Sequence, residues 1–417
     1  MPGERIQVPR GTFDVLPEDA AQRERVEDGA RQVLEPAGYR RIETPTFEAT
    51  ELFARGVGSS TDIVRKEMYT FDDGGGRSVT LRPEGTAPVC RAYVEHGMHK
   101  LAQPVKLWYL SPFYRREAPQ AGRFREFWQV GAEAIGSEDP AVDAELIVLL
   151  VELLERIQAR DVVLRVGSLG TPGTRREYRE RLIGHLRANE DRLAADVRER
   201  IDLNPLRAFD SDHPGTREVM RDAPRLLDHL DDEDRGHFAR VRELLDDADV
   251  SYEVDPTLVR GLDYYTRTVF EFESRALGAQ SGVGGGGRYD GLIQELGGDP
   301  TPGCGWAAGV ERMLLASGGQ PAAAAPVDLF VAYAKDDRRA LAFRLATDAR
   351  RAGLSAQHEL AGRSLKGQLK QAQRLGARWT AILGDEGASL KDMETGDQRV
   401  VDPDGLVAAV QRGERSL

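Results

Sequence analysis

The sequence predicts an α+β fold: a large N-terminal domain built on an antiparallel sheet with a helical insertion, followed by a small C-terminal α/β domain. Three observations lead to this prediction. Strand-like segments at 105–113 and 127–135 flank a basic loop, as in a β-hairpin. A charged, helix-patterned stretch at 171–249 interrupts further strand-like segments, and a small-residue segment at 318–326 reads as a linker.

Length and composition indicate the general class of protein. At 417 residues the chain exceeds one typical core, and its 40% hydrophobic and 30% charged residues are those of an ordinary globular protein. The longest apolar run, 146–154, contains Glu152 and is too short to span a bilayer, and the first residues lack a secretory signal pattern. Only Cys90 and Cys304 occur, so neither a zinc-ligand spacing nor a disulfide framework is present. We therefore expect a cytoplasmic protein that does not enter a membrane.

The linker divides the chain into predicted domains 1–325 and 326–417, which differ in charge. The second contains 15 Lys and Arg against 13 Asp and Glu, a net charge of +2, although the whole chain has a net charge of -12. The acidic total argues against indiscriminate nucleic-acid binding, but it allows a local basic surface.

The C-terminal domain alternates strand-like and helix-like segments, which predicts a mainly parallel sheet. Basic residues recur there at steps of three or four, as on one face of a helix. Like charges at this spacing disfavour an isolated helix by a few tenths of a kcal/mol per pair, which an anionic partner would relieve. A solvated basic face remains the alternative. These residues are Arg363, Lys366, Lys370, Arg374 and Arg378.

The hairpin carries the densest charge, in YRREAPQAGRFREFWQVGAE at 114–133. Side chains alternate between the two faces of a strand, so one face is predicted to hold Phe113, Arg115 and Glu117 on the first strand. On the second strand it holds Phe127, Gln129, Gly131 and Glu133. This could be the wet face of a sheet.

A substrate-binding face is the other reading of the hairpin. Gly131 weakens a strand unless something must approach it closely, and a substrate is a candidate. Arg115, and Arg123 in the loop, could form bidentate hydrogen bonds with an anion such as a phosphate.

Three further segments hold candidate residues. RPEGT at 82–86 places Glu84 after a predicted strand, where a carboxylate could meet an amine. RGLDYYTRT at 260–268 contains Tyr264 and Tyr265, which face opposite ways if extended. GCGWAAGVERMLL at 303–315 predicts a strand-to-helix turn with Arg312 beside Gly309.

The segment GVGGGG at 282–287 matches the dinucleotide fingerprint only formally. It lacks a βαβ unit around it, and we interpret its consecutive glycines as a mobile loop. Because GxxxxGK[ST] is also absent, the sequence predicts no P-loop nucleotide site.

In order along the chain, these motifs resemble those of histidyl-tRNA synthetases, a family of class II aminoacyl-tRNA synthetases. The segments 38–53, 114–133 and 303–315 are similar to class II motifs 1, 2 and 3. RGLDYYTRTVFE at 260–271 and GGRYDGL at 286–292 resemble the two segments that distinguish the histidine enzymes.

The resemblance implies a class II catalytic domain in 1–325 and an anticodon-binding domain in 326–417. It implies ATP with Mg²⁺, activation of L-histidine as an adenylate, transfer to tRNA(His), and a homodimer formed through motif 1. No residue is assigned to a metal.

The resemblance also implies residue roles. Arg115 and Arg260 would be the catalytic cations at the α-phosphate, and Phe127 would stack on adenine. The α-amino group would meet Glu84, Thr86 and Gln129, and the imidazole would meet Glu133 and Tyr265. The ATP set is Arg115, Glu117, Arg123, Phe127 and Arg312; the histidine set adds Tyr264; and the tRNA set is the basic stripe named above.

A regulatory subunit of ATP phosphoribosyltransferase, which shares the catalytic fold without charging tRNA, is the alternative. That relative lacks the anticodon-binding domain and usually has degraded signature segments, whereas both are present here. One departure from the family is Trp128, where bacterial relatives often have histidine; we expect altered packing there.

Overall fold

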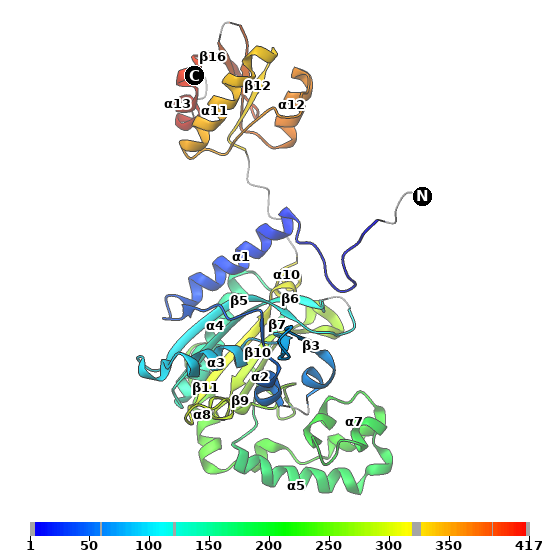
Figure 1. Ribbon diagram of the computed structural model, residues 1–417. Helices are drawn as coiled ribbons and strands as arrows, with labels where there is room; N and C mark the ends of the chain where they lie inside the picture. The colour runs from blue at the N-terminus through cyan, green and yellow to red at the C-terminus, as the bar shows by residue number, and fades with distance from the viewer. Residues whose placement is uncertain (1–4, 59–60, 120–121, 319–326, 386, 414–417) are drawn as a thin grey trace. The chain divides into compact units, whose positions relative to one another are not determined.

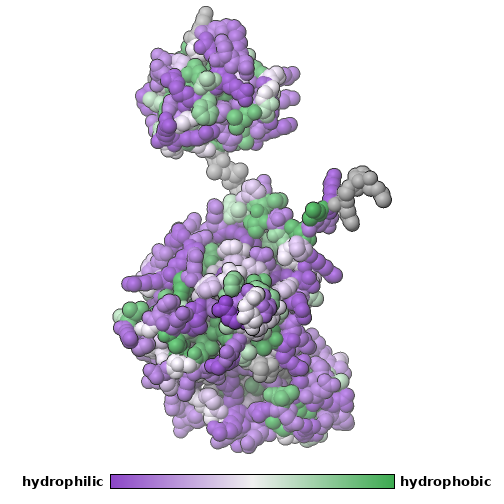
Figure 2. All heavy atoms as spheres, viewed as in Figure 1, coloured by the Kyte–Doolittle hydropathy of each residue, from purple (hydrophilic) through white to green (hydrophobic). Residues whose placement is uncertain are grey.

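A computed structural model describes residues 5–58, 61–119, 122–318, 327–385 and 387–413 of the chain (Figure 1). The chain separates into two compact units, Met1–Pro321 and Ala322–Leu417. Hydrophilic side chains dominate the face of each unit seen in Figure 2. None of the described helices is long and apolar enough to cross a membrane.

The N-terminal unit is built on an eight-stranded sheet with the order β1-β5-β6-β11-β10-β9-β7-β8. The six central strands are antiparallel, and only the edge pairs β1–β5 and β7–β8 are parallel. The predicted antiparallel fold is therefore confirmed. The strands are β1 (Arg40–Arg41), β5 (Val105–Tyr114), β6 (Glu126–Ile135), β7 (Val162–Ser168), β8 (Glu253–Val254), β9 (Thr266–Ser274), β10 (Gly282–Arg288) and β11 (Gly303–Gly309).

The predicted hairpin is formed by β5 and β6, with Phe113 opposite Phe127. The expectation for GVGGGG was wrong, because these residues form β10 in the middle of the sheet rather than a mobile loop. Glycine has no side chain whose alternation could reveal a strand, so its neighbours β9 and β11 determine its conformation.

One face of the sheet packs against helices in an apolar core that includes Trp108, Phe270 and Trp306. The covering helices are α1 (Pro17–Leu34), α4 (Pro140–Arg156), α8 (Asp232–Asp247) and α10 (Val310–Ala316). Because successive strand residues face opposite ways, the next residues, Tyr109, Glu271 and Ala307, lie on the other face. That face carries the candidate site.

A smaller three-stranded sheet of order β2-β4-β3 lies in the same unit. Near it, two π-helical turns, η1 (Ala54–Gly58) and η2 (Ile63–Glu67), precede the segment that leads to α3. The elements are β2 (Phe47–Ala49), α2 (Thr50–Phe53), β3 (Tyr69–Asp72), β4 (Ser78–Leu81), α3 (Thr86–Glu95) and α9 (Leu292–Glu295).

Helices inserted between β7 and β8 gather at one end of the unit (Figure 1). They are α5 (Pro172–Ala188), α6 (Ala195–Arg198) and α7 (Pro214–Arg221). The helix that follows, α8, packs on α4 instead. A buried ion cluster fixes it there, since Asp143 of α4 contacts both Arg288 of β10 at 2.5 Å and His237 of α8 at 2.8 Å.

The C-terminal unit has a five-stranded sheet of order β13-β12-β14-β15-β16. The first three strands are parallel, as predicted, and β15 and β16 add an antiparallel pair that the sequence patterns did not reveal. The elements are β12 (Leu329–Tyr333), α11 (Arg339–Arg351), β13 (Ala356–His358), α12 (Leu365–Arg374), β14 (Trp379–Leu383), β15 (Ala388–Asp392), β16 (Gln398–Val401) and α13 (Leu406–Arg412).

Short 3-10 turns complete the described structure. They are η3 (Met98–Lys100), η4 (Glu190–Arg192), η5 (Pro205–Asp210), η6 (Leu226–His229), η7 (Arg275–Gln280), η8 (Asp336–Arg338) and η9 (Pro403–Gly405).

Candidate active site

A cavity of about 240 Å³ opens on this second face of the eight-stranded sheet. Its floor follows one cross-strand row, in which Tyr109, Gly131, Ala307, Gly285 and Glu271 lie opposite one another in turn. The three middle residues are small, so the row forms a trough bounded by the large side chains at its two ends. The sheet register therefore determines where the cavity lies.

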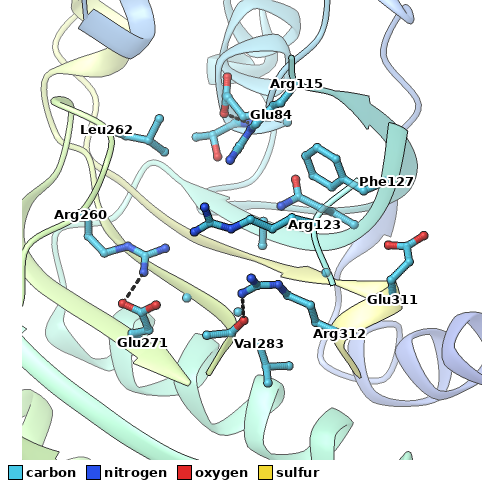
Figure 3. A pocket seen from close by; sticks show the side chains of 18 of the residues that line it. Glu84, Arg115, Arg123, Phe127, Arg260, Leu262, Glu271, Val283, Glu311 and Arg312 are labelled. Atoms are coloured by element: carbon cyan, nitrogen blue, oxygen red, sulfur yellow. Dashed lines mark hydrogen bonds and ion pairs between the residues drawn. The ribbon is translucent and has the colours of Figure 1, made fainter. Parts of the chain in front are cut away.

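Arginine side chains from four segments line this cavity (Figure 3). Arg115 follows the end of β5, donates from Nε to the carbonyl of Pro83 at 2.9 Å, and lies 5.3 Å from the Phe127 ring centre. Arg123 comes from the hairpin loop and pairs with Glu117 at 3.3 Å. Glu117 thus lies between Arg123 and Arg115, 3.8 Å from the latter.

The other two arginines approach from the far side. Arg260 pairs with Glu271 at 3.0 Å, and Arg312 of α10 donates to the carbonyls of Gly122 and Gly282. In Figure 3 the guanidinium groups of Arg123, Arg260 and Arg312 point toward the same space.

Two arginine pKa values describe the electrostatics of this end. Burial lowers the pKa of Arg312, and repulsion from Arg123 lowers it further. Burial also lowers the pKa of Arg260. Glu271, Tyr265 and Tyr264 raise it by more, so the pKa of Arg260 is raised overall. The cluster would gain from a bound anion, because cations packed together repel one another.

The cavity also holds uncharged hydrogen-bonding groups, and we call the part lined by Tyr109, Tyr264 and Tyr265 its tyrosine end. The Oε1 atom of Gln129 is buried and has no hydrogen-bond partner among the described residues. A buried acceptor without a donor costs about 1–3 kcal/mol, so a ligand N–H group would be bound favourably there. Tyr264 and Tyr265 line the same cavity, with ring centres 4.7 Å apart.

Glu84 lies at the N-terminus of α3, and both of its carboxylate oxygens accept backbone N–H groups. Thr86 N donates at 2.7 Å and Ala87 N at 3.0 Å. Burial raises the pKa of Glu84 to about 7, against the opposing effect of these hydrogen bonds. A carboxyl group that changes charge near neutral pH therefore lines the cavity.

Glu133 is fully buried and lies behind the cavity wall rather than in it. It accepts hydrogen bonds from the hydroxyls of Thr86 at 2.7 Å and Tyr289 at 2.6 Å, and the Tyr109 hydroxyl is 3.5 Å away. Burial raises the pKa of Glu133 to about 8, although the hydrogen bonds from Tyr289 and Thr86 lower it. Every other residue of the predicted histidine and ATP sets lines the cavity directly.

Tyr109 was not singled out from the sequence, yet its ring forms one end of the trough. A Cβ atom on Gly131 or on Gly85 would overlap this ring. The expectation that a substrate approaches Gly131 was therefore wrong, because the neighbouring strand's tyrosine takes that space. The signal was concealed because Tyr109 lies in the apolar run VKLWYL, which reads as ordinary core.

Trp128 lies on the face of β6 opposite Gln129 and packs against the core there. The Arg23 guanidinium of α1 lies 5.5 Å from a Trp128 ring centre and pairs with Glu311 at 2.6 Å. Glu311 in turn accepts the Trp128 backbone N–H.

The predicted basic stripe in the C-terminal unit is shorter than expected. Only Lys366, Lys370 and Arg374 lie on α12, at steps of four, and all three are exposed. Arg363 precedes the helix and contacts the buried Glu359 at 3.3 Å, whereas Arg378 follows the helix. The regular spacing of basic residues in the sequence therefore extends beyond both ends of α12.

A dedicated metal site is not evident in the described part of the chain, where no group of three or more His, Cys, Asp and Glu side chains could hold an ion. Glu117 and Glu271 are carboxylates that face the cavity, and each already contacts an arginine.

Comparison with known proteins identifies two matching families. A family model described as Histidyl-tRNA synthetase matches residues 11–313, and one described as Anticodon binding domain matches residues 328–413.

Individual relatives match over nearly the full length. A histidine–tRNA ligase of Halothermothrix orenii is 44% identical over 98% of this chain and 99% of its own. The crystal structure of apo S. aureus histidyl-tRNA synthetase superposes with a TM-score of 0.82 at 36% identity, covering 98% of this chain and 100% of that chain. A structure titled ATP phosphoribosyltransferase regulatory subunit/histidyl-tRNA synthetase, from Bacillus halodurans, has a TM-score of 0.65 at 24% identity, covering 88% and 97%. At that identity the last likeness concerns the fold alone.

Proposed function

The chain belongs to the histidyl-tRNA synthetase family and is an aminoacyl-tRNA ligase, and we propose that the cavity of Figure 3 is where it activates histidine with ATP. A carboxylate oxygen of histidine attacks the α-phosphorus, a new P–O bond forms, and the bond to pyrophosphate breaks. This displacement needs no protein nucleophile, so positioning and charge stabilisation supply the acceleration.

The arginine end of the cavity is the proposed triphosphate site. Arg115 and Arg260 approach the α-phosphate as catalytic cations, while Arg123 and Arg312 hold the outer phosphates. Phe127 stacks on adenine, and Glu117 keeps Arg115 and Arg123 apart, as its contacts with both support. Arginine stays charged at any working pH, which suits a fixed electrostatic clamp.

The tyrosine end is the proposed histidine site. Glu84, Thr86 and Gln129 receive the α-amino group, and the unpaired Oε1 of Gln129 supports this role. Tyr264 and Tyr265 line the imidazole pocket, where Tyr265 meets one ring nitrogen. Glu133 recognises the ring from behind the wall, through the Thr86 and Tyr109 hydroxyls beside it.

The observation that carries the proposal is that one cavity brings together four arginines, two tyrosines and a buried amide oxygen without a hydrogen-bond partner among the described residues. We propose that Mg²⁺ enters with ATP. Mg²⁺ usually keeps several waters and binds through phosphates and one or two carboxylates, which fits a cavity whose lining includes Glu117 and Glu271. The ion would neutralise phosphate charge.

Transfer to tRNA(His) is proposed to use the C-terminal unit, with Lys366, Lys370 and Arg374 contacting phosphates. Arg363 and Arg378 flank this surface. We also propose a cytoplasmic homodimer formed through motif 1. The exposed Phe47 and Phe71, whose ring centres are 6.2 Å apart, support an apolar contact there.

The regulatory subunit of ATP phosphoribosyltransferase is less supported as an alternative. The chain is 44% identical over nearly its whole length to a histidine–tRNA ligase, and it carries the anticodon-binding module.

ATP–pyrophosphate exchange with each of the twenty amino acids tests the proposal. We expect exchange with histidine alone, since a site built on hydrogen bonds rejects analogues that lack the matching groups by about 10⁴-fold or more. Exchange with another amino acid, or with none, would remove the proposed chemistry from this cavity.

A further inference from the structure

The glycine-rich strand β10 has no role in the mechanism proposed above, although four of its residues line the cavity. Glycine inside a strand lowers stability and has no side chain to pack, so four consecutive glycines at the centre of a sheet require a reason. The usual reason is that another group must come close to the backbone.

Two of these glycines leave room for one ion pair. A Cβ atom on Gly285 would lie 2.6 Å from the backbone oxygen of Phe270, and 2.9 Å from Nη1 and 3.0 Å from Nη2 of Arg260. A Cβ atom on Gly282 would lie 2.7 Å from Oε1 of Glu271. The two side chains that meet over this strand, Arg260 and Glu271, are 3.0 Å apart. Side chains on β10 would displace this pair.

The two partners differ in how firmly the backbone holds them. Arg260 lies in an irregular segment between β8 and β9, and its buried Nε has no hydrogen-bond partner among the described residues. An arginine side chain carries about 2 kcal/mol of rotamer entropy, so a loop position alone does not orient it. Glu271 lies on β9, directly opposite Gly285, where neighbouring strands on both sides fix the backbone.

We propose that Glu271 is a positioning residue for Arg260, and that Gly282 and Gly285 keep open the space in which this pair lies. The carboxylate holds one edge of the guanidinium over the strand, and the remaining N–H groups are thereby directed at the reacting phosphorus. This inference rests on the proposed function, because it assigns Glu271 a task only if Arg260 acts on the α-phosphate.

Glu271→Gln is the central test, and Glu273→Gln is its matched control. Both glutamates lie on β9, both side chains are 27% exposed, and both pair with an arginine. Only Glu271 lines the cavity. We expect Glu271→Gln to lower kcat of histidine-dependent pyrophosphate exchange by about ten- to a hundredfold, because small misplacements of a catalytic group have effects of that size. KM for ATP and histidine, and the control variant, should change little.

Gly282→Ala provides a second route to the same displacement. Its added methyl would meet side-chain atoms of Glu271 and Arg312 rather than backbone, so the strand should still form. We expect the same loss of kcat with a thermal unfolding curve close to that of the unchanged chain. Unchanged kcat in Glu271→Gln would by itself overturn the proposal.

Three further measurements separate positioning from other roles. In an Arg260→Ala background, adenylate formation measured in a single turnover with excess enzyme should respond little to Glu271→Gln; additive losses would overturn the proposal. A raised Mg²⁺ requirement in Glu271→Gln would make Glu271 an ion ligand instead, and faster turnover would make the pair an inhibitory contact. If Arg260→Ala keeps full activity, the proposed function fails. If Arg260→Ala loses activity but Glu271→Gln keeps it, the proposed function stands and this inference alone fails.

Discussion

The two ends of the cavity floor each admit a large side chain, but the surroundings of that side chain differ. At one end Tyr109 lies over Gly131 and Gly85, and at the other Arg260 lies over Gly285. Each end uses glycine to admit a large side chain to the sheet surface. The tyrosine end is buried and its hydroxyls and carboxylates are already hydrogen-bonded, whereas the arginine end gathers cations that still repel one another.

The difference indicates that the two ends have different tasks in the proposed reaction. Hydrogen bonds made before a ligand arrives hold the tyrosine end in one shape, which favours selection among amino acids. Cations that repel one another favour a polyanion, and in the proposed reaction they would stabilise the charge that develops as pyrophosphate leaves. Changes at the arginine end should therefore reduce turnover, and changes at the tyrosine end should reduce selection or stability.

Arg260→Ala should have the largest effect. Loss of the guanidinium removes charge stabilisation at the α-phosphate, and we expect pyrophosphate exchange to fall about 10³-fold or more, as for other arginines that act on transferred phosphates. ATP binding, measured by equilibrium dialysis, should persist because Arg115, Arg123 and Arg312 remain. Arg275→Ala, at an exposed arginine outside the cavity, is the control. Retained turnover would remove Arg260 from the mechanism.

Much of the arginine end was predictable from the sequence, because strand alternation places Arg115 and Phe127 on one face without knowledge of the fold. The hairpin followed from two segments rich in aromatic and β-branched residues around a turn, and the parallel strands of the second domain followed from the alternation of strand-like and helix-like segments. The glycine strand was not predictable, since glycine carries no pattern of faces and β10 is defined by its neighbours.

The tyrosine end was less predictable for a different reason. The burial of the Glu133 side chain depends on the neighbouring strand β11. Gly305 on that strand has no side chain and leaves room for the carboxylate. Tyr109 reads as core because cavity walls and cores use the same apolar residues. Which of the two a residue belongs to depends on tertiary packing.

Glu84→Gln should have the next largest effect, and it should depend on pH. Ionised Glu84 would bind the α-ammonium group, and a charged hydrogen bond contributes about 1.5–3 kcal/mol. At pH 8 we expect kcat/KM for histidine to be about ten- to a hundredfold lower in the variant. As pH falls through the Glu84 pKa of about 7, the unchanged enzyme loses this charge and the two should converge.

The ratio of the two enzymes is the quantity to measure, because the titration of histidine itself is common to both and cancels. A ratio that stays constant between pH 6 and pH 8 would contradict the assignment. The raised pKa has a second consequence: the unliganded fold binds this proton more tightly than the unfolded chain does. Its contribution to stability is therefore present at low pH and is lost as pH rises toward 7.

Gly131→Ala tests whether the tyrosine end is rigid. The added methyl would overlap the Tyr109 ring, which is 3% exposed and has little room to move. Overpacking of this kind costs about 1–3 kcal/mol, which denaturant unfolding would detect. Gly291→Ala is the control, since a methyl there meets no atom within 4 Å. An unfolding midpoint like that of the control would show that Tyr109 can move away.

The smallest effects are expected in the C-terminal unit, where neighbouring basic residues differ in whether they pair with an acid. Arg363 contacts Glu359, but Lys366 and Lys370 make no ion pair with any described residue. We expect Lys366→Gln and Lys370→Gln each to weaken tRNA binding a few-fold. Each should also lower the slope of log K against log salt concentration by about one, because each lost phosphate contact releases fewer counterions. Arg351→Gln, at an exposed arginine on α11, is the control, and an equal slope change there would mean that net charge, rather than this helix face, attracts the tRNA.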